Sequence, residues 1–454
     1  MANKKVIIAG AGLSGTLLGI YLADSGYEVE IYEKRLDMRK TDAGAGRSIN
    51  LAISVRGLAA LDKIGLQRTV LKGAMPMRGR MIHSEKGTTT FQPYGVAEQD
   101  CINSISRGFL NAVLMDEAEK RNNVKIHFDR ALESLNLEKS KAVFKSADGK
   151  TETIDYQLLV GADGAGSMVR KALEDSGHTQ TNNDILPYGY KELTIPPGPP
   201  GRRFSLEENA LHIWPRKSYM LIALPNSDGS FTCTLFLPYH GPVSFDQLQT
   251  ADRLQEFFLQ HFPDAYPLLT DLNSHFFKNP TGLLGTVRSR PWSYKDKVLL
   301  LGDAAHAVVP FYGQGMNCAF ESTQKLIELL QMDSNLERAF KEFENQRRPN
   351  TEAIADMALA NFVEMRDLVG DPRFLLKKEV SLKLSREYPK EFVDQYSLVT
   401  FRTTPYFWAK QAGDLQERLL NDLCKDAQTI ADIDWEKARN LVKDYHARFR
   451  ERLH

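Results

Sequence analysis

Three glycines near the N-terminus have the spacing of a phosphate-binding loop. They form the pattern G-x-G-x-x-G at Gly10, Gly12 and Gly15. The pattern follows a short apolar run at 6–9, which is typical of a buried strand, and leads into an apolar helical segment. Glycines at this spacing let the backbone turn tightly and approach a pyrophosphate at the N-terminus of the next helix. The pattern therefore indicates a site for a dinucleotide.

A carboxylate follows the second strand of this segment. The alternating run 28–32 ends in Glu33, about where an acid accepts hydrogen bonds from ribose hydroxyls. A carboxylate there fits an unphosphorylated ribose, as in FAD or NAD, better than one that carries a 2′-phosphate. A signal peptide or membrane anchor after Lys4 and Lys5 is disfavoured, because glycines and polar residues interrupt the apolar run and no cleavage site follows it.

The composition indicates a chain of several domains without a charge bias. Its 454 residues are too many for one small core, so two or three domains are expected. Lys plus Arg and Asp plus Glu both number 58, which gives no support for binding nucleic acid. The four cysteines show neither a C-x-x-C pair nor metal-ligand spacing, so we expect reduced thiols in the cytoplasm and no metal site.

Two further strand-to-helix turns carry acids. An apolar strand that begins at Gln157 leads into Asp163, and Ser167 is placed to cap a helix over 168–174. This pattern alone is also that of a simple structural turn.

The other turn lies within residues 298–317. A buried strand there ends at Asp303, and a glycine-containing loop leads to Asn317 and a helix over 318–330. An acid at the end of a strand can accept hydrogen bonds from ribityl hydroxyls, and the backbone N–H groups of a helix start can face a developing negative charge. His306 has no partner ligands nearby in the sequence, so a packed structural role is favoured over a metal ligand or a base.

The remaining segments are less specific. Arg47 is a candidate contact for the cofactor phosphates, and a surface arginine is an equal alternative. Residues 77–94 predict a hairpin. Arg80 and Tyr94 would face each other across it if the loop is odd-length and centred on Gly87, whereas an even loop would separate them, and the sequence does not fix this register. Three extended segments over 210–238 predict an antiparallel sheet, and the C-terminal part of the chain is helical in pattern.

Three separated motifs occur together in one order. They are G-A-G-L-S-G at Gly10, G-A-D-G-A-G-S at Gly161 and G-D-A-A-H at Gly302. In this combination the chain resembles the FAD-dependent aromatic hydroxylases, the single-component flavoprotein monooxygenases. The resemblance implies non-covalent FAD, with the first motif at its ADP moiety, the second near FAD and the passing NADPH, and the third at the ribityl chain. It also implies that FAD reduced by NADPH adds O2 to give a C4a-hydroperoxide, which hydroxylates an electron-rich ring.

Four further segments narrow the resemblance to those members of the family that hydroxylate L-kynurenine. They are G-R-S-I-N-L-A-I-S from Gly46, M-R-G-R-M-I-H-S from Met77, V-P-F-Y-G-Q-G-M-N from Val309 and N-F-V-E-M from Asn361. The implied product is 3-hydroxy-L-kynurenine, in a step of tryptophan degradation that leads to quinolinate and NAD. The charged C-terminal sequence differs from the membrane helix of some eukaryotic members, so no membrane attachment is expected.

The resemblance also implies which residues form the site. Substrate contacts that hold the amino-acid end of kynurenine are implied at Arg80, Tyr94, Asn361 and Tyr396. A loop beside the flavin ring is implied at Pro310, Phe311 and Tyr312, and no dedicated catalytic base is identified. The implied cofactor contacts are Gly10, Gly12, Gly15, Glu33, Arg35, Arg47, Ala52, Arg107, Asp163, Asp303, Gly315, Met316 and Asn317.

The expected fold is α/β: a Rossmann-type FAD-binding domain with an inserted antiparallel-sheet substrate domain and a helical C-terminal region. The FAD-binding domain is expected at 1–75, 98–185 and 284–350, the substrate domain at 76–97 and 186–283, and the helical region at 351–454. A monomer or homodimer is expected. Three alternatives stay open: a family member that acts on a phenol or another aromatic acid, a non-catalytic flavoprotein, and an NAD-dependent dehydrogenase.

Overall fold

The computed structural model describes the backbone of residues 5–40, 50–97, 99–368 and 371–453. The chain divides into two compact units, each assembled from three separated stretches. Unit 1 comprises residues 1–73, 105–186 and 285–355. Unit 2 comprises residues 74–104, 187–284 and 356–454. Helix α10 (Leu336–Val363) begins in unit 1 and ends in unit 2.

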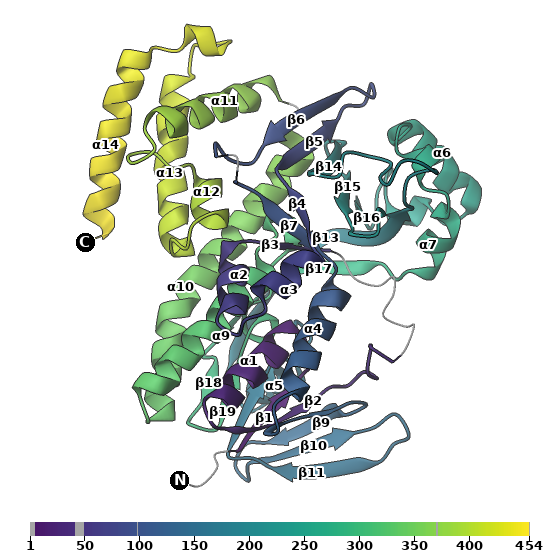
Figure 1. The fold of residues 1–454 in the computed structure, drawn as a ribbon, viewed down its shortest axis with the longest axis vertical. Coiled ribbons are helices and arrows are strands. Elements are labelled where there is room, and N and C mark those ends of the chain that lie inside the picture. Colours follow the sequence, from purple (N-terminus) through teal and green to yellow (C-terminus); the bar gives the residue numbers. More distant parts are fainter. Residues whose placement is uncertain (1–4, 41–49, 98, 369–370, 454) are drawn as a thin grey trace. The chain divides into compact units, whose positions relative to one another are not determined.

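Unit 1 is built on a six-stranded sheet with the N-terminal strand near its centre (Figure 1). In order across the sheet, the strands are β18 (Ser293–Tyr294), β19 (Val298–Leu300), β12 (Leu158–Gly161), β1 (Lys5–Ala9), β2 (Glu28–Tyr32) and β8 (Val124–His127). All neighbours pair in parallel except β18 and β19. Because parallel strands end at one edge of a sheet, the residues after β1, β2, β12 and β19 meet there. This sheet confirms the expected Rossmann-type architecture.

Helices cover this sheet, as expected for buried parallel strands (Figure 1). Those of unit 1 are α1 (Leu13–Asp24), α2 (Val55–Asp62), α3 (Gln67–Lys72), α4 (Arg107–Glu119), α5 (Met168–Asp175), α8 (Asp303–His306) and α9 (Gly315–Met332). Helix α1 is buried on nearly all sides because it packs against the sheet, α4 and α9. The unit also contains β3 (Leu51–Ile53) and a small antiparallel sheet of β9 (Ala131–Asn136), β10 (Lys141–Lys145) and β11 (Thr151–Asp155).

Unit 2 contains most of a seven-stranded sheet that confirms the predicted antiparallel segments. Its order is β17 (Gly282–Arg290), β13 (Gln180–Ile195), β16 (Phe231–Pro238), β15 (Met220–Pro225), β14 (Ala210–Pro215), β5 (Gly79–His83) and β6 (Thr89–Pro93). The predicted hairpin is confirmed as β5 and β6, and it joins the sheet because β5 pairs in parallel with β14. Arg80 lies opposite Gln92 rather than Tyr94, so Arg80 and Tyr94 are diagonal neighbours. A separate antiparallel pair is formed by β4 (Met75–Met77) and β7 (Ile102–Ile105).

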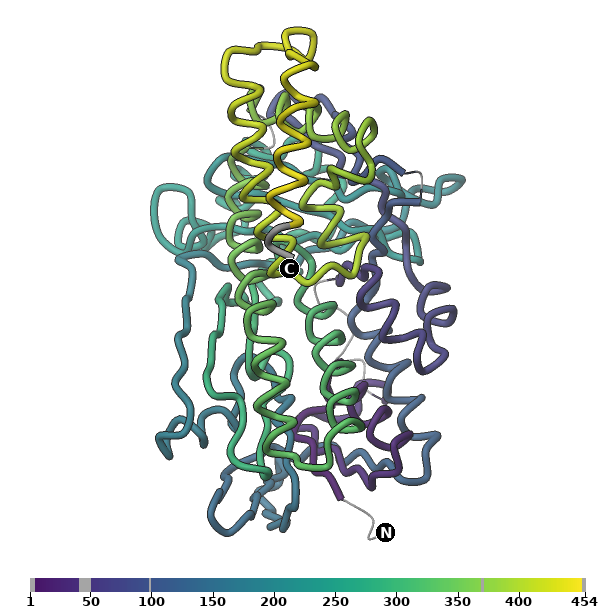
Figure 2. Tube along the Cα trace, turned by 90° about the vertical axis from the view of Figure 1, so that its left-hand side faces the viewer, coloured from purple at the N-terminus to yellow at the C-terminus, as the bar shows by residue number. Residues whose placement is uncertain are grey.

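The C-terminal part of unit 2 is helical, as its sequence predicted. Beyond α10 it contains a π-helical turn (Glu364–Leu368), α11 (Pro372–Glu387), α12 (Gln395–Thr400), α13 (Tyr406–Leu423) and α14 (Trp435–Leu453). Figure 2 shows α13 and α14 as two adjacent yellow helices, which share an apolar core with α11. Two further helices, α6 (Ala251–His261) and α7 (Leu272–Lys278), pack on the sheet of unit 2. Within the described residues, none of the helices combines the length and the apolar character that crossing a membrane requires.

Candidate active site

The glycines of the first motif leave an open helix start in unit 1. Gly10 has a φ of +103°, and a Cβ there would lie 2.5 Å from the carbonyl oxygen of Ala162. A Cβ on Gly15 would lie 2.1 Å from the carbonyl oxygen of Gly10, so neither position accepts a larger residue. Gly12, the N-cap of α1, has nothing within 4 Å of its Cβ position. The first turn of α1 therefore presents backbone N–H groups on an open side, which fits a pyrophosphate.

The carboxylate of Glu33 lies beside this turn, at the end of β2. Its Oε2 accepts a hydrogen bond from the backbone N–H of Ala11 at 2.9 Å. Its Oε1 accepts from the Arg35 backbone N–H at 3.0 Å and from the Arg35 Nε at 2.7 Å. Burial acts to raise the pKa of Glu33, but the bonds from Arg35 and Ala11 bring it below its usual value. Glu33 is therefore ionised at neutral pH and keeps lone pairs for ribose hydroxyls.

Asp303 lies directly after β19, at the same edge of the sheet. It is partly buried, and its carboxylate has no hydrogen bond or ion pair among the described residues. Burial raises the pKa of this carboxyl, and the charge of Arg107 acts in the opposite direction. A carboxylate without an internal partner fits ligand hydroxyls, such as those of a ribityl chain.

Asp163 has the equivalent position after β12, but its oxygens are already used. Oδ1 accepts from the Ser167 hydroxyl at 2.5 Å, and Oδ2 accepts from the backbone N–H of Met168 at 2.7 Å. Ser167 in turn accepts from the backbone N–H of Arg170 at 3.0 Å, which confirms the predicted cap of α5. These bonds support the interpretation of this motif as a structural turn around the Asp163 side chain.

Arg170 connects the second and third motifs, which the sequence did not indicate. Its buried guanidinium donates to the carbonyl oxygen of Ala165 at 2.5 Å and to that of Ala304 at 2.7 Å. The apolar spacing of α5 could have marked Arg170 as buried, but nothing in the sequence shows which carbonyls it meets.

Asn317 joins three backbone segments of unit 1. Its Oδ1 accepts from the backbone N–H of Ser54 at 3.0 Å. Its Nδ2 donates to the carbonyl oxygens of Ala52 at 2.8 Å and Gly313 at 2.9 Å. Gly313 has a φ of +66°, and a Cβ there would lie 3.0 Å from the Cβ of Ala52. The structure thus brings together Ala52, Asn317 and the loop before α9.

That loop is the one implied to lie beside the flavin. Pro310–Tyr312 form a short 3-10 turn in which Phe311 is buried, and Gly313 ends the turn in the left-handed region. Helix α9 then begins at Gly315, and its N-cap Gln314 makes no side-chain capping bond. The first N–H groups of α9, including that of Met316, therefore stay available for a ligand with partial negative charge.

Replacing Asn317 by Asp should loosen this junction. An aspartate can accept from Ser54 but cannot donate, so two partly buried carbonyl oxygens lose their donor. Unsatisfied buried polar groups cost about 1–3 kcal/mol each, so we expect the free energy of unfolding in urea to fall by about 2 kcal/mol or more. Asn335→Asp is the control, because its exposed side chain only accepts a bond, from the backbone N–H of Arg338. Equal losses in the two variants would contradict this role.

An ion triad connects α9 to α2 and to α10. Glu321 of α9 pairs with Arg56 of α2 at 2.9 Å and with Arg347 of α10 at 3.0 Å. Arg347 also donates to the Ser322 hydroxyl at 3.1 Å. No local sequence pattern indicates this triad, since its members lie far apart in the chain.

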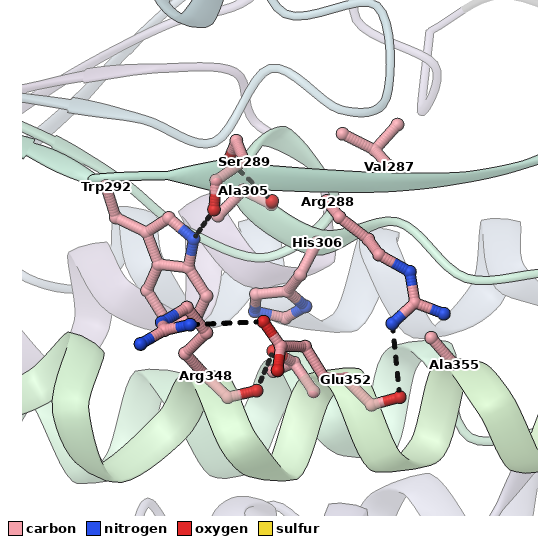
Figure 3. Close-up of a pocket in the computed structure, with 10 residues that line it drawn as sticks. Val287, Arg288, Ser289, Trp292, Ala305, His306, Arg348, Glu352 and Ala355 are labelled. Atoms are coloured by element: carbon pink, nitrogen blue, oxygen red, sulfur yellow. Dashed lines mark hydrogen bonds and ion pairs between the residues drawn. The ribbon is translucent and has the colours of Figure 1, made fainter. Parts of the chain in front are cut away.

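His306 has the surroundings of a packed structural histidine. Figure 3 shows it in a small hollow beside Trp292 and the Arg348–Glu352 ion pair. Burial lowers the pKa of His306 to about 3, so the ring is neutral, and it packs against Trp292 at a centroid distance of 5.2 Å. Among the described residues, no group of three or more His, Cys, Asp or Glu is arranged to hold a metal ion.

A buried cation and two tyrosines form a cluster in unit 2, which we call the clamp. Arg80 is only 7% exposed, and its guanidinium is paired with the Glu364 carboxylate at 2.9 Å. The guanidinium carbon lies 5.7 Å from the ring centroid of Tyr94 and 5.5 Å from that of Tyr396. The two tyrosine rings stack with centroids 5.2 Å apart. Burial acts to lower the pKa of Arg80, but Glu364, Tyr94 and Tyr396 together outweigh it and raise this pKa. Burial raises the pKa of Tyr94 to about 12.

Two polar atoms of the clamp have no partner among the described residues. They are the Nε of Arg80 and the hydroxyl of Tyr94, both buried. Since buried polar groups are nearly always hydrogen-bonded in native proteins, these atoms indicate a place for a polar ligand. Glu364 was missed as a site residue, although it is the acid of the N-F-V-E-M segment.

Two other predicted site residues are Asn361, an implied substrate contact, and Arg47, an implied cofactor contact. Asn361 is buried on α10, one turn before Glu364, with its Nδ2 3.4 Å from the sulfur of Met365. Arg47 lies outside the described residues. Apart from Arg47, every implied cofactor residue belongs to unit 1, and all four implied substrate residues belong to unit 2.

Comparison with known proteins identifies the family. A family described as "FAD binding domain" matches residues 3–196 and 285–358. The kynurenine 3-monooxygenase of Myxococcus xanthus is 48% identical over 439 residues, which cover 96% of this chain and 94% of that relative. The chain belongs to the kynurenine 3-monooxygenase family. The kynurenine 3-monooxygenase of Dictyostelium discoideum is 42% identical over 460 residues, which cover 98% of this chain and 99% of the relative.

Solved structures of low sequence identity share the fold of this member of the kynurenine 3-monooxygenase family. The tetrameric form of 2-methyl-3-hydroxypyridine-5-carboxylic acid oxygenase has a TM-score of 0.65 at 21% identity, over 83% of this chain and 96% of that chain. P. aeruginosa PqsL in complex with 2-aminobenzoylacetate has a TM-score of 0.64 at 19% identity, over 80% of this chain and 97% of that chain. The predicted flavin-dependent monooxygenase with an FAD-binding domain is confirmed.

Proposed function

We propose that the chain converts L-kynurenine into 3-hydroxy-L-kynurenine with NADPH and O2. The observation that carries the proposal is the buried clamp, because an arginine with an unpartnered Nε beside an unpartnered tyrosine hydroxyl suits an α-carboxylate. Bound FAD supplies the oxidation chemistry, since it takes a hydride from NADPH and activates dioxygen. The protein binds and orients the reactants.

Arg80 is the residue that would hold the substrate carboxylate. A guanidinium has five N–H donors and can grip a carboxylate through two parallel bonds, which lysine cannot reproduce. One of its nitrogens is already bonded to Glu364, and this bond fixes the side chain before substrate arrives. The Tyr94 hydroxyl can add a further bond to the same carboxylate. A simple phenol lacks the charged group that this arrangement recognises.

The substrate itself reduces the need for a catalytic base. The aniline nitrogen of kynurenine activates the ring carbon next to it, whereas a phenol gains from losing its proton. Glu364 is held by Arg80 and so acts as the counter-ion of the clamp rather than as a free base. The clamp therefore favours an aniline substrate over the phenol that a related hydroxylase of this family would use.

The residues of unit 1 would hold the cofactor. The open N-terminus of α1 suits the pyrophosphate, Glu33 the ribose hydroxyls and Asp303 the ribityl hydroxyls. The N-terminus of α9 suits negative charge on the reduced ring. These assignments follow from the donors and acceptors that each position offers.

The decisive experiment is product analysis. The purified yellow protein, supplied with L-kynurenine, NADPH and air, should form 3-hydroxy-L-kynurenine, identified by chromatography and mass. Denaturation should release intact FAD, because no covalent link is expected. NADPH oxidation that kynurenine does not stimulate would contradict the proposal, and so would a product hydroxylated at another position.

Replacing Tyr312 by alanine should raise the share of NADPH that ends as hydrogen peroxide. If the Pro310–Tyr312 turn borders the flavin, it excludes water from the oxygenating centre. We expect the ratio of product to NADPH to fall by about twofold or more. Tyr27→Ala is the control, because it precedes β2 and so lies at the sheet edge opposite the cofactor motifs. An unchanged ratio in Tyr312→Ala would argue against this placement of the turn.

The cytoplasmic location and the assembly as a monomer or homodimer also belong to this proposal. All four cysteines are unpaired, in agreement with a reducing compartment. Light scattering of the FAD-loaded protein should give the mass of one or two chains.

A further inference from the structure

A chain of hydrogen bonds, buried at its centre and partly buried at its ends, links three polar side chains of unit 2 outside the clamp. His83, the last residue of β5, contacts Asp264 through Nδ1 at 2.8 Å and His212 of β14 through Nε2 at 2.9 Å. His212 Nε2 lies 2.8 Å from the carbonyl oxygen of Glu207. Trp214 donates to the same Asp264 oxygen at 2.8 Å and stacks on the His83 ring. We call His83, His212 and Asp264 the relay.

The relay needs three protons to form its three hydrogen bonds. Both ends are acceptors, the Asp264 carboxylate and the Glu207 carbonyl, so each end needs a proton from the imidazole that faces it. Two neutral imidazoles supply these two protons only. Two bare nitrogens of His83 and His212 would then face each other at 2.9 Å. A third proton turns this repulsion into a hydrogen bond and also balances the carboxylate charge, which burial favours.

Burial and neighbouring groups shift the pKa values of two relay residues, His212 and Asp264. Burial lowers the pKa of His212 to about 4, and the neighbouring His83 acts in the same direction, so a fourth proton enters only in acid. Burial acts to raise the pKa of Asp264, but the bonds from His83 and Trp214 bring it below its usual value. The count of hydrogen bonds therefore assigns the third proton to the pair of imidazoles as a whole, opposite an ionised Asp264.

The other charged and titratable groups around the relay are few. Arg216 donates to the carbonyl oxygen of His83 at 3.2 Å, and its positive charge opposes the third proton. Arg216 also donates to the carbonyl oxygen of His261, whose ring bonds to the Tyr219 hydroxyl at 2.7 Å. Glu85 acts electrostatically on Arg216 and His261 and partly offsets this charge.

We propose that the relay positions the clamp, with His83 as a positioning residue: the hydrogen bond between His83 and His212, which the third proton of the pair completes, keeps Arg80 in place. This inference rests on the proposed function. Both residues belong to β5, where side chains alternate, so the relay holds the strand from the face opposite the Arg80 guanidinium. The relay joins β5 to β14 through His212 and to the segment that follows α6 through Asp264. On its other side, β5 pairs with β6, which is the edge strand of the sheet. Loss of the third proton breaks the central bond and lets β5 shift.

The test compares proton count with substrate affinity across pH in the FAD-loaded enzyme. Protein labelled with ¹⁵N-histidine reports the imidazole protons of the relay, and titration with L-kynurenine gives the dissociation constant at each pH. His83→Asn and His212→Asn assign the signals. We expect one protonated ring among the two at pH 7. When the relay loses this proton at higher pH, we expect the dissociation constant to rise about tenfold at the same midpoint.

Asp264→Asn distinguishes a titrating relay from a merely structural one. Without the carboxylate charge, the third proton is less favourable, so the imidazole midpoint and the affinity midpoint should move to lower pH together. Asp252→Asn removes the same charge at an exposed position of α6 and should move neither. Two neutral rings at pH 7, or an affinity profile that does not follow the wild-type imidazole titration, would overturn the inference. If kynurenine fails to bind at any pH, the proposed function is wrong, while the proton count remains measurable.

Discussion

Replacing Arg80 by alanine should weaken binding of L-kynurenine to the FAD-loaded enzyme by about 30-fold or more. Arg80 is buried and paired with Glu364 at 2.9 Å, so its removal leaves the substrate carboxylate and Glu364 without their cation. Truncating one partner of a buried charge pair typically costs about 2–5 kcal/mol, and about 1.4 kcal/mol corresponds to a factor of ten. Titration of the flavin absorbance with kynurenine measures the change.

Three controls separate the clamp from a general defect. FAD content should stay normal in Arg80→Ala, because the cofactor motifs belong to unit 1. Arg80→Lys should recover only part of the affinity, since an ammonium cannot make two parallel bonds to a carboxylate. Arg253→Ala removes an exposed arginine of the same unit and should leave the affinity unchanged. If Arg80→Ala binds kynurenine as well as the parent does, Arg80 has a structural role only.

Replacing Asp303 by alanine should weaken FAD retention by about tenfold or more. The Asp303 carboxylate is partly buried and has no hydrogen-bond partner among the described residues, so FAD hydroxyls would be its principal donors. Hydrogen bonds to charged groups contribute about 1.5–3 kcal/mol, which sets the size of the effect. Reconstitution of the apoprotein with FAD, followed by quenching of flavin fluorescence, gives the dissociation constant.

Two comparisons test the reason for this effect. Asp303→Asn keeps an acceptor oxygen without the charge, so its loss of affinity should be intermediate. Asp296→Ala removes an exposed carboxylate in the turn before β19 and should retain FAD like the parent. Normal FAD affinity in Asp303→Ala would show that this carboxylate does not hold the cofactor.

The sequence could predict the local parts of the fold because each depends on neighbouring residues. The run 6–9, the glycines after it and Glu33 lie within one strand–helix–strand segment, and the structure places them as predicted. The cap of α5 by Ser167 is equally local. Element type follows from hydrophobic period and turn chemistry, which short segments carry in full.

Long-range side-chain partners were the part that could not be predicted. The register of β5 and β6 depends on loop conformation, so the diagonal placement of Arg80 and Tyr94 was open from the sequence. Glu364 reaches Arg80 from 284 positions away, and Asn317 reaches Ser54 from 263 positions away. Periodicity marks such residues as buried but carries no information on which buried group they meet. The residues implied by resemblance remain predictions of function until the variants are measured.

The interleaving of the two units constrains how the chain can be made. Strand β1 leaves the ribosome long before two of the strands of its sheet, β12 at 158–161 and β19 at 298–300. Unit 2 likewise begins at residue 74 and is completed only by the last helix, α14. Unit 1 therefore cannot close before residue 355 has been made, and unit 2 closes later still, so apolar strands of both stay exposed during most of synthesis. Such a chain depends on late, non-local closure, which makes folding slow and chaperone assistance valuable.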